Sequence, residues 1–357
     1  MTNKKHSNQT VCVAMSGGVD SAVAAALLVE QGFRVIGAFM KNWSLNQQGV
    51  SYQPWENEAN VAKAVCEKLK IPFHIFDFEK EYLSRVVQSF VQDYARGLTP
   101  NPDVLCNREI KFDLFIKEAQ KLGADLIATG HYAQIKPVEG RLGLFAGADS
   151  NKDQSYFLYT LGQPELKFTL FPIGHLTKPE VRKIAADLNL PNAAKKDSQG
   201  VCFIGPVSMR QFLQHYLKPQ SGEVVDQNGR VIGHHDGVIY YTEGQRHGFS
   251  TGGNHEPLYI ARKYIKKNQL VVVPANDPML YCQSVNLIDC SWVDQPIPDQ
   301  TKCLVRIRYR QPLQPAIVSV NDGKYQIDFE NPIEFVSAGQ SAVIYLGEQV
   351  LGGGIIA

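Results

Sequence analysis

The stretch VAMSGGVDSAVAAALLVEQG, Val13 to Gly32, decides which fold to expect. An apolar strand end runs into two glycines flanked by serines. An Ala-rich helix follows, expected from about Ser21 to Gln31, with Gly32 as its C-terminal cap. This is the order of a Walker A phosphate loop, GxxxxGK[ST], without its lysine. Glycine N–H groups and a helix start can hold a pyrophosphate group, but the lysine that assists transfer of a terminal phosphoryl group is missing. The loop therefore predicts cleavage of ATP between the α and β phosphates, with AMP passing to the substrate.

A simpler interpretation of the same stretch is a glycine turn in which Asp20 or Ser21 only caps the helix. An isolated SGG would favour that interpretation. The longer pattern SGGxDS, set between a buried strand and an Ala-rich helix, favours a phosphate site instead. Asp20 could then hold the Mg²⁺ that accompanies ATP.

The first half of the chain alternates between strand-like and helix-like segments. Strand–helix–strand units of this kind predict an α/β fold with a doubly wound parallel sheet and helices on both faces. After Pro206 the pattern changes to Gly-rich pieces and then to short strands separated by Pro, Asn and Gly. We therefore expect three domains: an ATP-binding catalytic domain over residues 1–208, a small central domain over 209–280, and an antiparallel β-barrel over 281–357.

Composition narrows the class of protein. The hydrophobic fraction of 44% and the charged fraction of 20% are typical of a soluble globular protein. No apolar run reaches the ~20 residues of a membrane helix, and the N-terminus has no signal core, so we expect no membrane association and a cytoplasmic location. A net charge of +1 requires that any RNA-binding surface be local. The seven cysteines form no CxxC pair, which argues against structural zinc.

Two cysteines lie in unusual surroundings. Cys106 stands in LTPNPDVLCNREIKF, between prolines and a helix start, where Arg108 and Lys111 are expected to lower the thiol pKa. Asp103 could exchange protons with a substrate. Cys202 stands in a polar loop, KKDSQGVCFIG. Either one alone could equally be a buried loop cysteine, but together they could form a sulfur relay that ends in a transient disulfide. The remaining five are expected to be core residues: Cys12, Cys66, Cys282, Cys290 and Cys303.

Several motifs together resemble one family. These are NPDVLCNREIKF, TGHYA, KDQSYFLYTL, DSQGVCFIG, YTEGQRHG, RIRYRQP and AGQSAVIY, spread from Val11 to about Ile356. In content and order they resemble the tRNA-specific 2-thiouridylases of the PP-loop ATP pyrophosphatase superfamily. The chain departs from many relatives at Ala22 and Gln134, where Ser and Arg are expected. Gln134 would remove one positively charged contact. The resemblance implies an adenine nucleotide alpha hydrolase-like catalytic domain and a tRNA-binding barrel.

The activity implied by this resemblance is ATP-dependent 2-thiolation of the wobble uridine, position 34, in the tRNAs for Lys, Glu and Gln. AMP would be placed on uracil O2, and sulfur would then replace the activated oxygen. Cys202 would carry the sulfur as a persulfide received from a donor protein, either a cysteine desulfurase or a relay carrier. Cys106 would be the nucleophile that releases it, leaving a Cys106–Cys202 disulfide for reductants to reopen.

The resemblance also implies binding residues. The ATP site would comprise Ala14, Met15, Ser16, Gly17, Gly18, Val19, Asp20, Ser21, Met40 and Gly130. The target base would meet Asn101, Pro102 and Asp103. The tRNA would contact His131, Lys152, Asp153, Gln154, Arg308, Tyr309 and Gln340.

Two basic stretches bear on RNA binding. RIRYR alternates, so Arg306, Arg308 and Arg310 are expected on one face of a strand, with Tyr309 opposite unless a bulge intervenes. The second, ARKYIKK over residues 261–267, could equally be a solvated turn. We further expect a hinge between sheet and barrel, and loops around Cys106 and Cys202 that reorder when tRNA binds.

Two other functions remain open at this point. One is an adenylating PP-loop ligase or amidotransferase that acts on a small molecule. The other is a non-catalytic protein that binds RNA or a nucleotide. A monomer is the default expectation.

Overall fold

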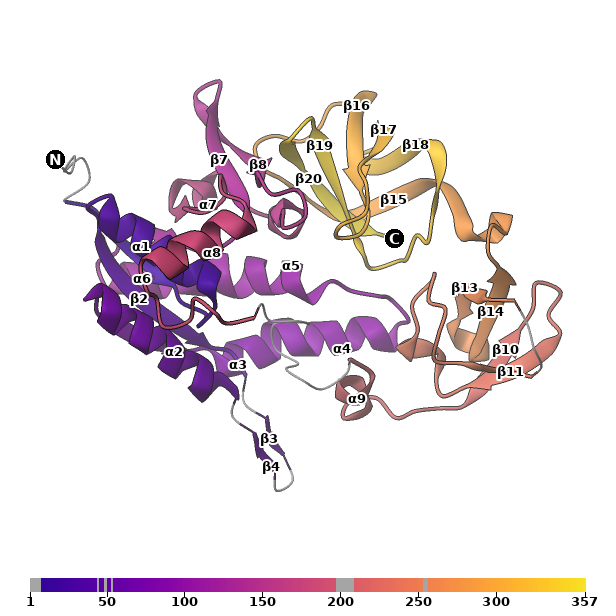
Figure 1. The fold of residues 1–357 in the computed structure, drawn as a ribbon. Coiled ribbons are helices and arrows are strands. Elements are labelled where there is room, and N and C mark those ends of the chain that lie inside the picture. The colour runs from indigo at the N-terminus through magenta and orange to yellow at the C-terminus, as the bar shows by residue number, and fades with distance from the viewer. Residues whose placement is uncertain (1–7, 44, 48–49, 53, 197–208, 253–255) are drawn as a thin grey trace.

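The computed structural model describes residues 8–43, 45–47, 50–52, 54–196, 209–252 and 256–357. Cys202 therefore lies outside the described residues. The described residues form three sheets of five, five and eight strands and a separate two-stranded hairpin, and helices pack around the N-terminal sheet (Figure 1). Along the described residues, no helix combines the length and the apolar character that crossing a membrane requires.

The N-terminal sheet is parallel, with the order β5-β2-β1-β6-β9. Its strands are β1 (Thr10–Ala14), β2 (Arg34–Lys41), β5 (Phe73–Asp77), β6 (Leu126–Ala128) and β9 (Thr169–Leu170). The chain moves from β1 to β2 and β5 on one side, and then crosses to β6 on the other side of β1. The strand order thus reverses between β1 and β6. In open parallel sheets, the crevice at such a switch point is where ligands bind.

Helices cover both faces of this sheet, as expected for a doubly wound fold. Val11 and Val13 of β1 pack in one core with α1, while Cys12 and Ala14 pack in a second core on the opposite face. The helices are α1 (Val19–Glu30), α2 (Pro54–Leu69), α3 (Glu79–Tyr82), α4 (Gln88–Ala95), α5 (Pro102–Cys106), α6 (Phe115–Lys121), α7 (Gln163–Lys167), α8 (Lys178–Asp187) and α9 (Met209–Gln214). A short hairpin joins β3 (Leu45–Gln47) to β4 (Val50–Tyr52). Alternate β1 residues therefore serve two separate cores.

Two long helices on the second face are each built from several segments. The π-helical segment η1 (Leu83–Val87) joins α3 to α4, and η2 (Asn107–Leu114) joins α5 to α6. The second helix thus begins at Pro102, and the Asn101 side chain caps it by accepting bonds from the N–H groups of Asp103 and Val104. Cys106 consequently lies within a helix rather than in a loop.

The C-terminal domain is a closed antiparallel barrel. Its strands are β15 (Tyr281–Trp292), β16 (Thr301–Arg306), β17 (Gln314–Asn321), β18 (Lys324–Glu334), β19 (Ser341–Leu346) and β20 (Gln349–Ile356). Pairing of β15 with both β18 and β20 closes the barrel. The hairpin formed by β7 (Ala133–Val138) and β8 (Arg141–Ala146) belongs to the N-terminal half of the chain, yet β8 pairs with β20 through Leu144 and Val350. The barrel sheet is therefore anchored directly on the N-terminal half of the chain.

The central domain has its own sheet, ordered β12-β11-β10-β14-β13. The strands are β10 (Gly222–Val225), β11 (Val231–His235), β12 (Ser250–Thr251), β13 (Leu258–Tyr264) and β14 (Gln269–Pro274). A small separate core, which includes Val224, Ile260, Leu270 and Val272, supports this sheet.

Candidate active site

The loop after β1 has the geometry that close approach of a phosphate requires. Gly17 has a φ of 75°, and a Cβ atom there would lie 2.6 Å from the Glu58 carbonyl oxygen. The Ser16 hydroxyl accepts a bond from the Gly18 N–H at 3.3 Å. The Ser21 hydroxyl donates to the Gly18 carbonyl at 3.1 Å. Only glycine fits at position 17, and the serines fix the loop against the start of α1.

The TGHYA segment after β6 closes the other side of this loop. A Cβ atom on Gly130 would lie 2.7 Å from the Ser21 nitrogen and 2.8 Å from the Asp20 carbonyl carbon. The two glycine-containing segments therefore touch at the switch point between β1 and β6. Met40, at the end of β2, lies in the neighbouring strand along the same carboxyl edge of the sheet. The structure thus brings the residues of the predicted ATP site to one place.

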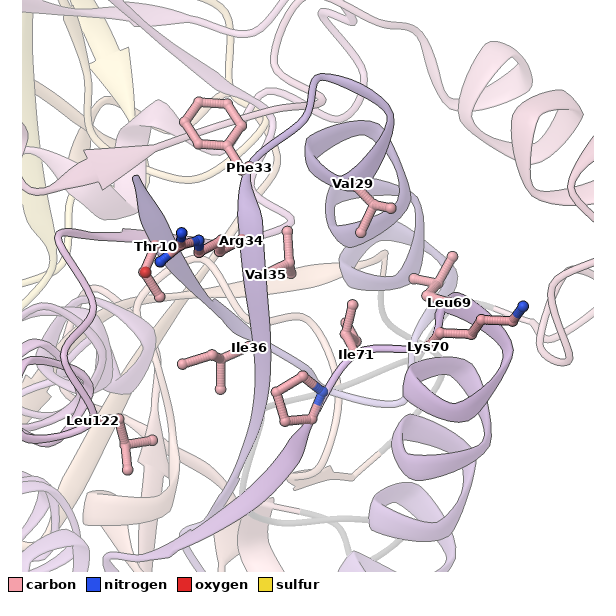
Figure 2. Close-up of a pocket in the computed structure, with 11 residues that line it drawn as sticks. Thr10, Val29, Phe33, Arg34, Val35, Ile36, Leu69, Lys70, Ile71 and Leu122 are labelled. Carbon is pink, nitrogen blue, oxygen red and sulfur yellow. The ribbon is translucent and has the colours of Figure 1, made fainter. Parts of the chain in front are cut away.

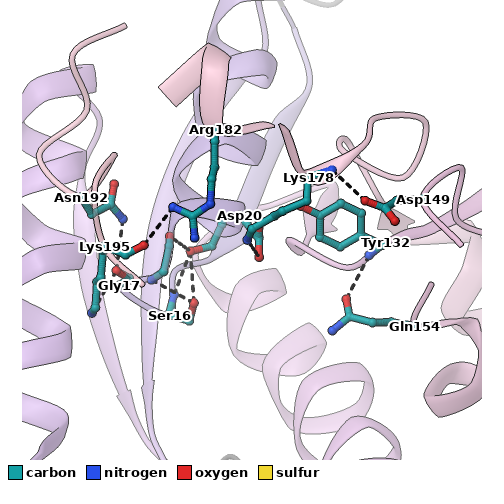
Figure 3. Close-up of polar contacts among 12 residues, drawn as sticks. Ser16, Gly17, Asp20, Tyr132, Asp149, Gln154, Lys178, Arg182, Asn192 and Lys195 are labelled. Atoms are coloured by element: carbon teal, nitrogen blue, oxygen red, sulfur yellow. Dashed lines mark hydrogen bonds and ion pairs between the residues drawn. The ribbon is translucent and has the colours of Figure 1, made fainter. Parts of the chain in front are cut away.

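Two lysines that the sequence did not single out for this loop lie against it (Figure 3). The Lys178 ammonium is 2.7 Å and 2.9 Å from the two carboxylate oxygens of Asp20. Tyr132 donates its hydroxyl to the same carboxylate at 2.8 Å. On the other side, Lys195 pairs with Glu58 and donates to the Gly17 carbonyl at 3.3 Å. The loop lacks a lysine of its own, but the fold supplies two.

The N-terminus of α8 is firmly anchored beside the loop. Glu180 accepts bonds from both the N–H and the hydroxyl of Thr177 at 2.7 Å. The Lys178 N–H donates to Asp149 at 2.9 Å. Asn192 donates to the Gly17 carbonyl at 3.1 Å, beyond the end of α8. The only sequence signal for this arrangement is TKPE, a helix start after an apolar strand. That signal says where α8 begins and not what its first residue contacts.

Cys106 corrects one expectation. The thiol is 1% exposed and lies in the core that also contains Tyr82, Ile110 and Phe115. Burial raises its pKa, and the Asp103 carboxylate adds to this, although Lys111 and the Tyr82 hydroxyl act in the opposite direction. The predicted lowering of the pKa is therefore wrong for this conformation, because removal from water outweighs the nearby positive charge.

The segment expected to meet the target base directly precedes Cys106 on α5. Pro102 is buried, whereas Asn101 and Asp103 are partly exposed. Asp103 and Cys106 are three residues apart on one helix, so they lie on the same side of it. All six described cysteines are free thiols, and Cys12, Cys66 and Cys303 are buried as predicted. Cys282 and Cys290 are only partly buried.

Comparison with known proteins then gives the family. Three family models match in succession: a tRNA methyl transferase HUP domain over residues 9–206, a tRNA methyl transferase PRC-barrel domain over 210–274, and an aminomethyltransferase β-barrel domain over 282–356. The tRNA-specific 2-thiouridylase MnmA of Geobacillus thermodenitrificans is 45% identical over 99% of this chain and 96% of its own length.

This chain belongs to the tRNA-specific 2-thiouridylase family. The Sodalis glossinidius member is 48% identical over 97% of this chain and 96% of its own length. A Francisella tularensis member is 46% identical over 98% of this chain and 99% of its own length. The resemblance found in the sequence motifs is thereby confirmed.

The segment before Asn101, which is expected to meet the target base, is where the three domains of this chain meet. The Thr99 N–H donates to the Ala338 carbonyl at 2.8 Å, and Gln340 donates to the Thr99 carbonyl at 2.6 Å. The Thr99 hydroxyl donates to the Thr242 hydroxyl and accepts from the Lys263 ammonium, each at 3.4 Å and each in the central domain. We call these contacts the Thr99 junction. It ties both the barrel and the central domain to the backbone two residues before Asn101.

The residues expected to contact tRNA fall into two groups. His131 and Asp153 are buried: the His131 ring bonds Thr129 at 2.7 Å, and burial lowers its pKa well below the usual value. Gln154, Arg308 and Gln340 are partly exposed and already bond protein groups. Lys152 and Tyr309 are also partly exposed. RNA could reach these five partly exposed side chains more readily than the buried His131 and Asp153.

The prediction that three arginines of RIRYR share one strand face is wrong. Strand β16 ends at Arg306, which pairs with buried Asp153 at 3.0 Å. Arg308 donates to the Glu243 carbonyl at 2.7 Å, and exposed Arg310 has a φ of 66° in a turn. The alternation stops because the chain leaves the sheet, and Tyr309 packs on Phe157 with ring centroids 4.5 Å apart.

The second basic stretch, ARKYIKK, is divided between surface and interior. Arg262, Lys266 and Lys267 are exposed. Lys263 instead turns inward to the Tyr241 carbonyl at 2.9 Å, and burial lowers its pKa to about 8. The interpretation of this stretch as a solvent-exposed turn is therefore wrong for Lys263, which is part of the Thr99 junction.

A separate pocket lies at the opposite edge of the N-terminal sheet (Figure 2). Its volume is about 530 Å³, and its walls include Thr10, Val29, Arg34, Ile71 and Leu122. Thr10 and Arg34 begin β1 and β2, whereas the phosphate loop follows the end of β1. This pocket is therefore remote from the residues of the candidate site.

Proposed function

We propose that this protein is an ATP-dependent tRNA 2-thiouridylase that acts on uridine 34 of the tRNAs for Lys, Glu and Gln. Two lines of support meet. Relatives named tRNA-specific 2-thiouridylases are 45–48% identical over nearly the whole chain. The observation that carries the proposal is the close approach of Gly130 to the start of α1, since it brings two glycine segments together at the switch point of the sheet, where ligands bind in such folds.

The first step activates a poor leaving group. The uracil O2 attacks the α phosphorus of ATP, the bond from that phosphorus to the bridging oxygen breaks, and pyrophosphate leaves with the electron pair. Residues 14–21 and Gly130 hold the phosphates, and Asn101, Pro102 and Asp103 hold the base. Extruding a base from an anticodon loop costs a few kcal/mol at most.

In the second step sulfur replaces the activated oxygen. Cys202 carries a persulfide supplied by a cysteine desulfurase or a relay carrier. Its terminal sulfur ends on C2, AMP leaves, and the Cys106 thiol and the Cys202 sulfur become a disulfide. Overall, uridine, ATP, the Cys202 persulfide and the Cys106 thiol give 2-thiouridine, AMP, pyrophosphate and the Cys106–Cys202 disulfide. Cellular thiols then reduce that disulfide, as a cytoplasmic location would allow.

Magnesium would accompany ATP and would shield the phosphate charges. Asp20, at the start of α1, is the carboxylate expected to hold the ion, but Lys178 and Tyr132 already bond it. In the part of the chain that the structure describes, no three His, Cys, Asp or Glu side chains gather as a metal site would need. The residues therefore suit an ion carried in by the nucleotide better than a resident one.

The domains would divide the work as the sequence pattern suggested: residues 1–208 for ATP and chemistry, 209–280 as a connecting domain, and 281–357 for tRNA. Lys152, Gln154, Arg308, Tyr309 and Gln340 would contact tRNA directly. His131 and Asp153 would need local rearrangement, because both are buried. Cys106 is also buried, so tRNA binding would have to open its surroundings.

Mass spectrometry of the wobble nucleoside tests this proposal. Purified protein is incubated with MgATP, unmodified tRNA for Lys and a persulfide source. The expected result is an oxygen-to-sulfur mass gain at position 34 and release of one pyrophosphate per modified base. ATP cleavage that depends on a small amine instead of tRNA would favour a PP-loop ligase or amidotransferase. Binding of tRNA without pyrophosphate release would favour a non-catalytic protein.

A further inference from the structure

We propose that Lys178 supplies the cation that the phosphate loop lacks and contacts the pyrophosphate part of ATP. This inference rests on the proposed function and adds a binding residue to it. The loop sequence SGGVDS ends without a lysine, and Lys178 lies 158 positions after Asp20 in the chain. The fold, and not the local sequence, places its ammonium at the loop.

The position of the ammonium carries the argument. Asp20 lies in the first turn of α1, where the backbone N–H groups of a helix point toward a bound anion. Lys178 reaches both oxygens of this carboxylate, and its side chain is 9% exposed (Figure 3). An anion held at the start of α1 would therefore meet the Lys178 ammonium within a side-chain rotation.

A purely structural role explains this ion pair less well. Taking the Lys178 ammonium out of water costs free energy, and its pair with Asp20, whose side chain is 32% exposed, would seldom stabilise a fold more than an apolar contact. The surroundings nonetheless fix the lysine closely: Asp149 bonds its N–H, and its ammonium lies 6.0 Å from the centre of the Tyr132 ring. An ammonium group that the fold holds in one position is suited to bind an anionic ligand such as pyrophosphate.

Lys195 makes a different set of contacts. It pairs with Glu58 on α2 and donates to the Gly17 carbonyl, so it holds the loop backbone in shape. Lys178 instead bonds the carboxylate of Asp20 with its ammonium. Lys178 could therefore leave Asp20 and bind a phosphate group without loosening the loop backbone. Lys195 could not, because it bonds that backbone directly.

The chemical consequence concerns the leaving group. When uracil O2 attacks the α phosphorus, the electron pair of the broken bond goes to the bridging oxygen of pyrophosphate. An ammonium beside that oxygen stabilises the added charge and transfers no proton. Lys178 would thus act on both the β and γ phosphates before the step and on pyrophosphate after it.

Calorimetric titration of the full chain, without tRNA, tests the inference. The probes are ATP, AMP and inorganic pyrophosphate, each with Mg²⁺. Lys178→Met should raise the Kd for ATP and for pyrophosphate about 10- to 150-fold, as the loss of a charged hydrogen bond predicts. The Kd for AMP should stay within about twofold of the unaltered chain. Lys178→Arg, which keeps the charge, should retain most of the affinity.

The matched control is Lys183→Met, which removes an exposed lysine of the same helix and should change none of the three constants. Equal weakening of ATP and AMP by Lys178→Met would overturn the inference, because it would show only a distorted loop. Unchanged pyrophosphate binding would also overturn it.

A second variant guards against misfolding caused by an unpaired Asp20. The double variant Lys178→Met/Asp20→Asn removes both charges of the ion pair, so no buried charge is left unpaired. Its reference is the single variant Asp20→Asn. The double variant should bind pyrophosphate at least 10-fold more weakly than the single one. Equal affinity would overturn the inference. The proposed function is separable, because a chain that binds pyrophosphate through Lys178 but adds no sulfur to tRNA would refute thiolation and leave the role of Lys178 intact.

Discussion

The proposed site has two halves, a phosphate half around the loop of residues 14–21 and a sulfur half around Cys106, and these are in opposite states. The phosphate half is assembled: Gly17, Gly130, Lys178 and Lys195 surround one loop at the carboxyl edge of the sheet. The sulfur half is closed, since Cys106 lies in a hydrophobic core with a thiol that is 1% exposed and a raised pKa.

This difference suggests an order of events. A preformed phosphate half can bind ATP before any other partner arrives. A buried thiol cannot attack a persulfide until its surroundings move, so the second half would depend on tRNA. Such a sequence protects both the thiol and the activated base from water and from side reactions.

The largest expected effect comes from Cys106→Ser. A hydroxyl at this position cannot complete the disulfide, so thiolation of tRNA in a single turnover should fall on the order of 10³-fold or more. Release of pyrophosphate with tRNA should continue, because the phosphate half is untouched. The measurement pairs mass spectrometry of the wobble nucleoside with a pyrophosphate assay. Undiminished thiolation would remove Cys106 from the relay.

Alkylation of the cysteines tests whether the sulfur half is closed. In the free protein at pH 8, iodoacetamide should modify Cys106 roughly 100-fold more slowly than partly buried Cys282, as burial and low thiolate content predict. Because the pKa is raised, the Cys106 rate should still be rising above pH 9. Peptide mass spectrometry gives both rates. If ATP and tRNA leave the Cys106 rate unchanged, the two halves do not differ in the proposed way.

Gly130→Ala probes the phosphate half. The new methyl group would press on backbone atoms of Asp20 and Ser21, so the loop must shift or the segment must retreat. We expect a loss of about 1–3 kcal/mol in the free energy of unfolding and a Kd for ATP raised about tenfold. Gly252→Ala is the control, since its Cβ would meet nothing closer than 3.9 Å. Similar behaviour of the two variants would mean that the loop is less rigid than the geometry indicates.

Comparison of the two halves also shows what a sequence can reveal. The doubly wound sheet and the barrel were predictable because their signals are local: a buried strand, a glycine loop, a helix cap. Gly17 and Gly130 belong to short motifs and were found. Lys178 was missed because its contact with Asp20 spans 158 positions. Docking of β8 on β20 was equally hidden, since it depends on how two domains meet.

Burial was the other quantity that the sequence did not disclose. Arg108 and Lys111 near Cys106 suggested an electropositive, accessible thiol. Whether a helix faces solvent or core depends on what packs against it, and Tyr82 and Phe115 enclose this one. The RIRYR prediction failed for another reason: strand β16 ends at Arg306, so the chain leaves the sheet before it reaches Arg308 and Arg310.

The smallest expected effect concerns Lys263 in the Thr99 junction, which connects the barrel to the sulfur half. Burial lowers its pKa from 10.5 to about 8, which corresponds to at most about 3 kcal/mol against the charged form. Between pH 8 and 10.5 Lys263 therefore holds its proton more tightly in the unfolded chain than in the folded one, and the contribution of this lysine to stability should rise with pH across that window. Below pH 8 both forms are protonated, so this lysine contributes no slope there.

Lys263→Met should abolish that rise while it leaves the free energy of unfolding at pH 7 equal or higher, because a buried charge has been removed. Denaturant midpoints at pH 7, 8.5 and 10 provide the measurement, and exposed Lys266→Met is the control. The lost bonds to Tyr241 and Thr99 work in the opposite direction, so a sharp loss of stability at pH 7 would mean that these bonds outweigh the burial of charge. In that case the junction, and not the core around Cys106 alone, would hold the sulfur half in its closed state.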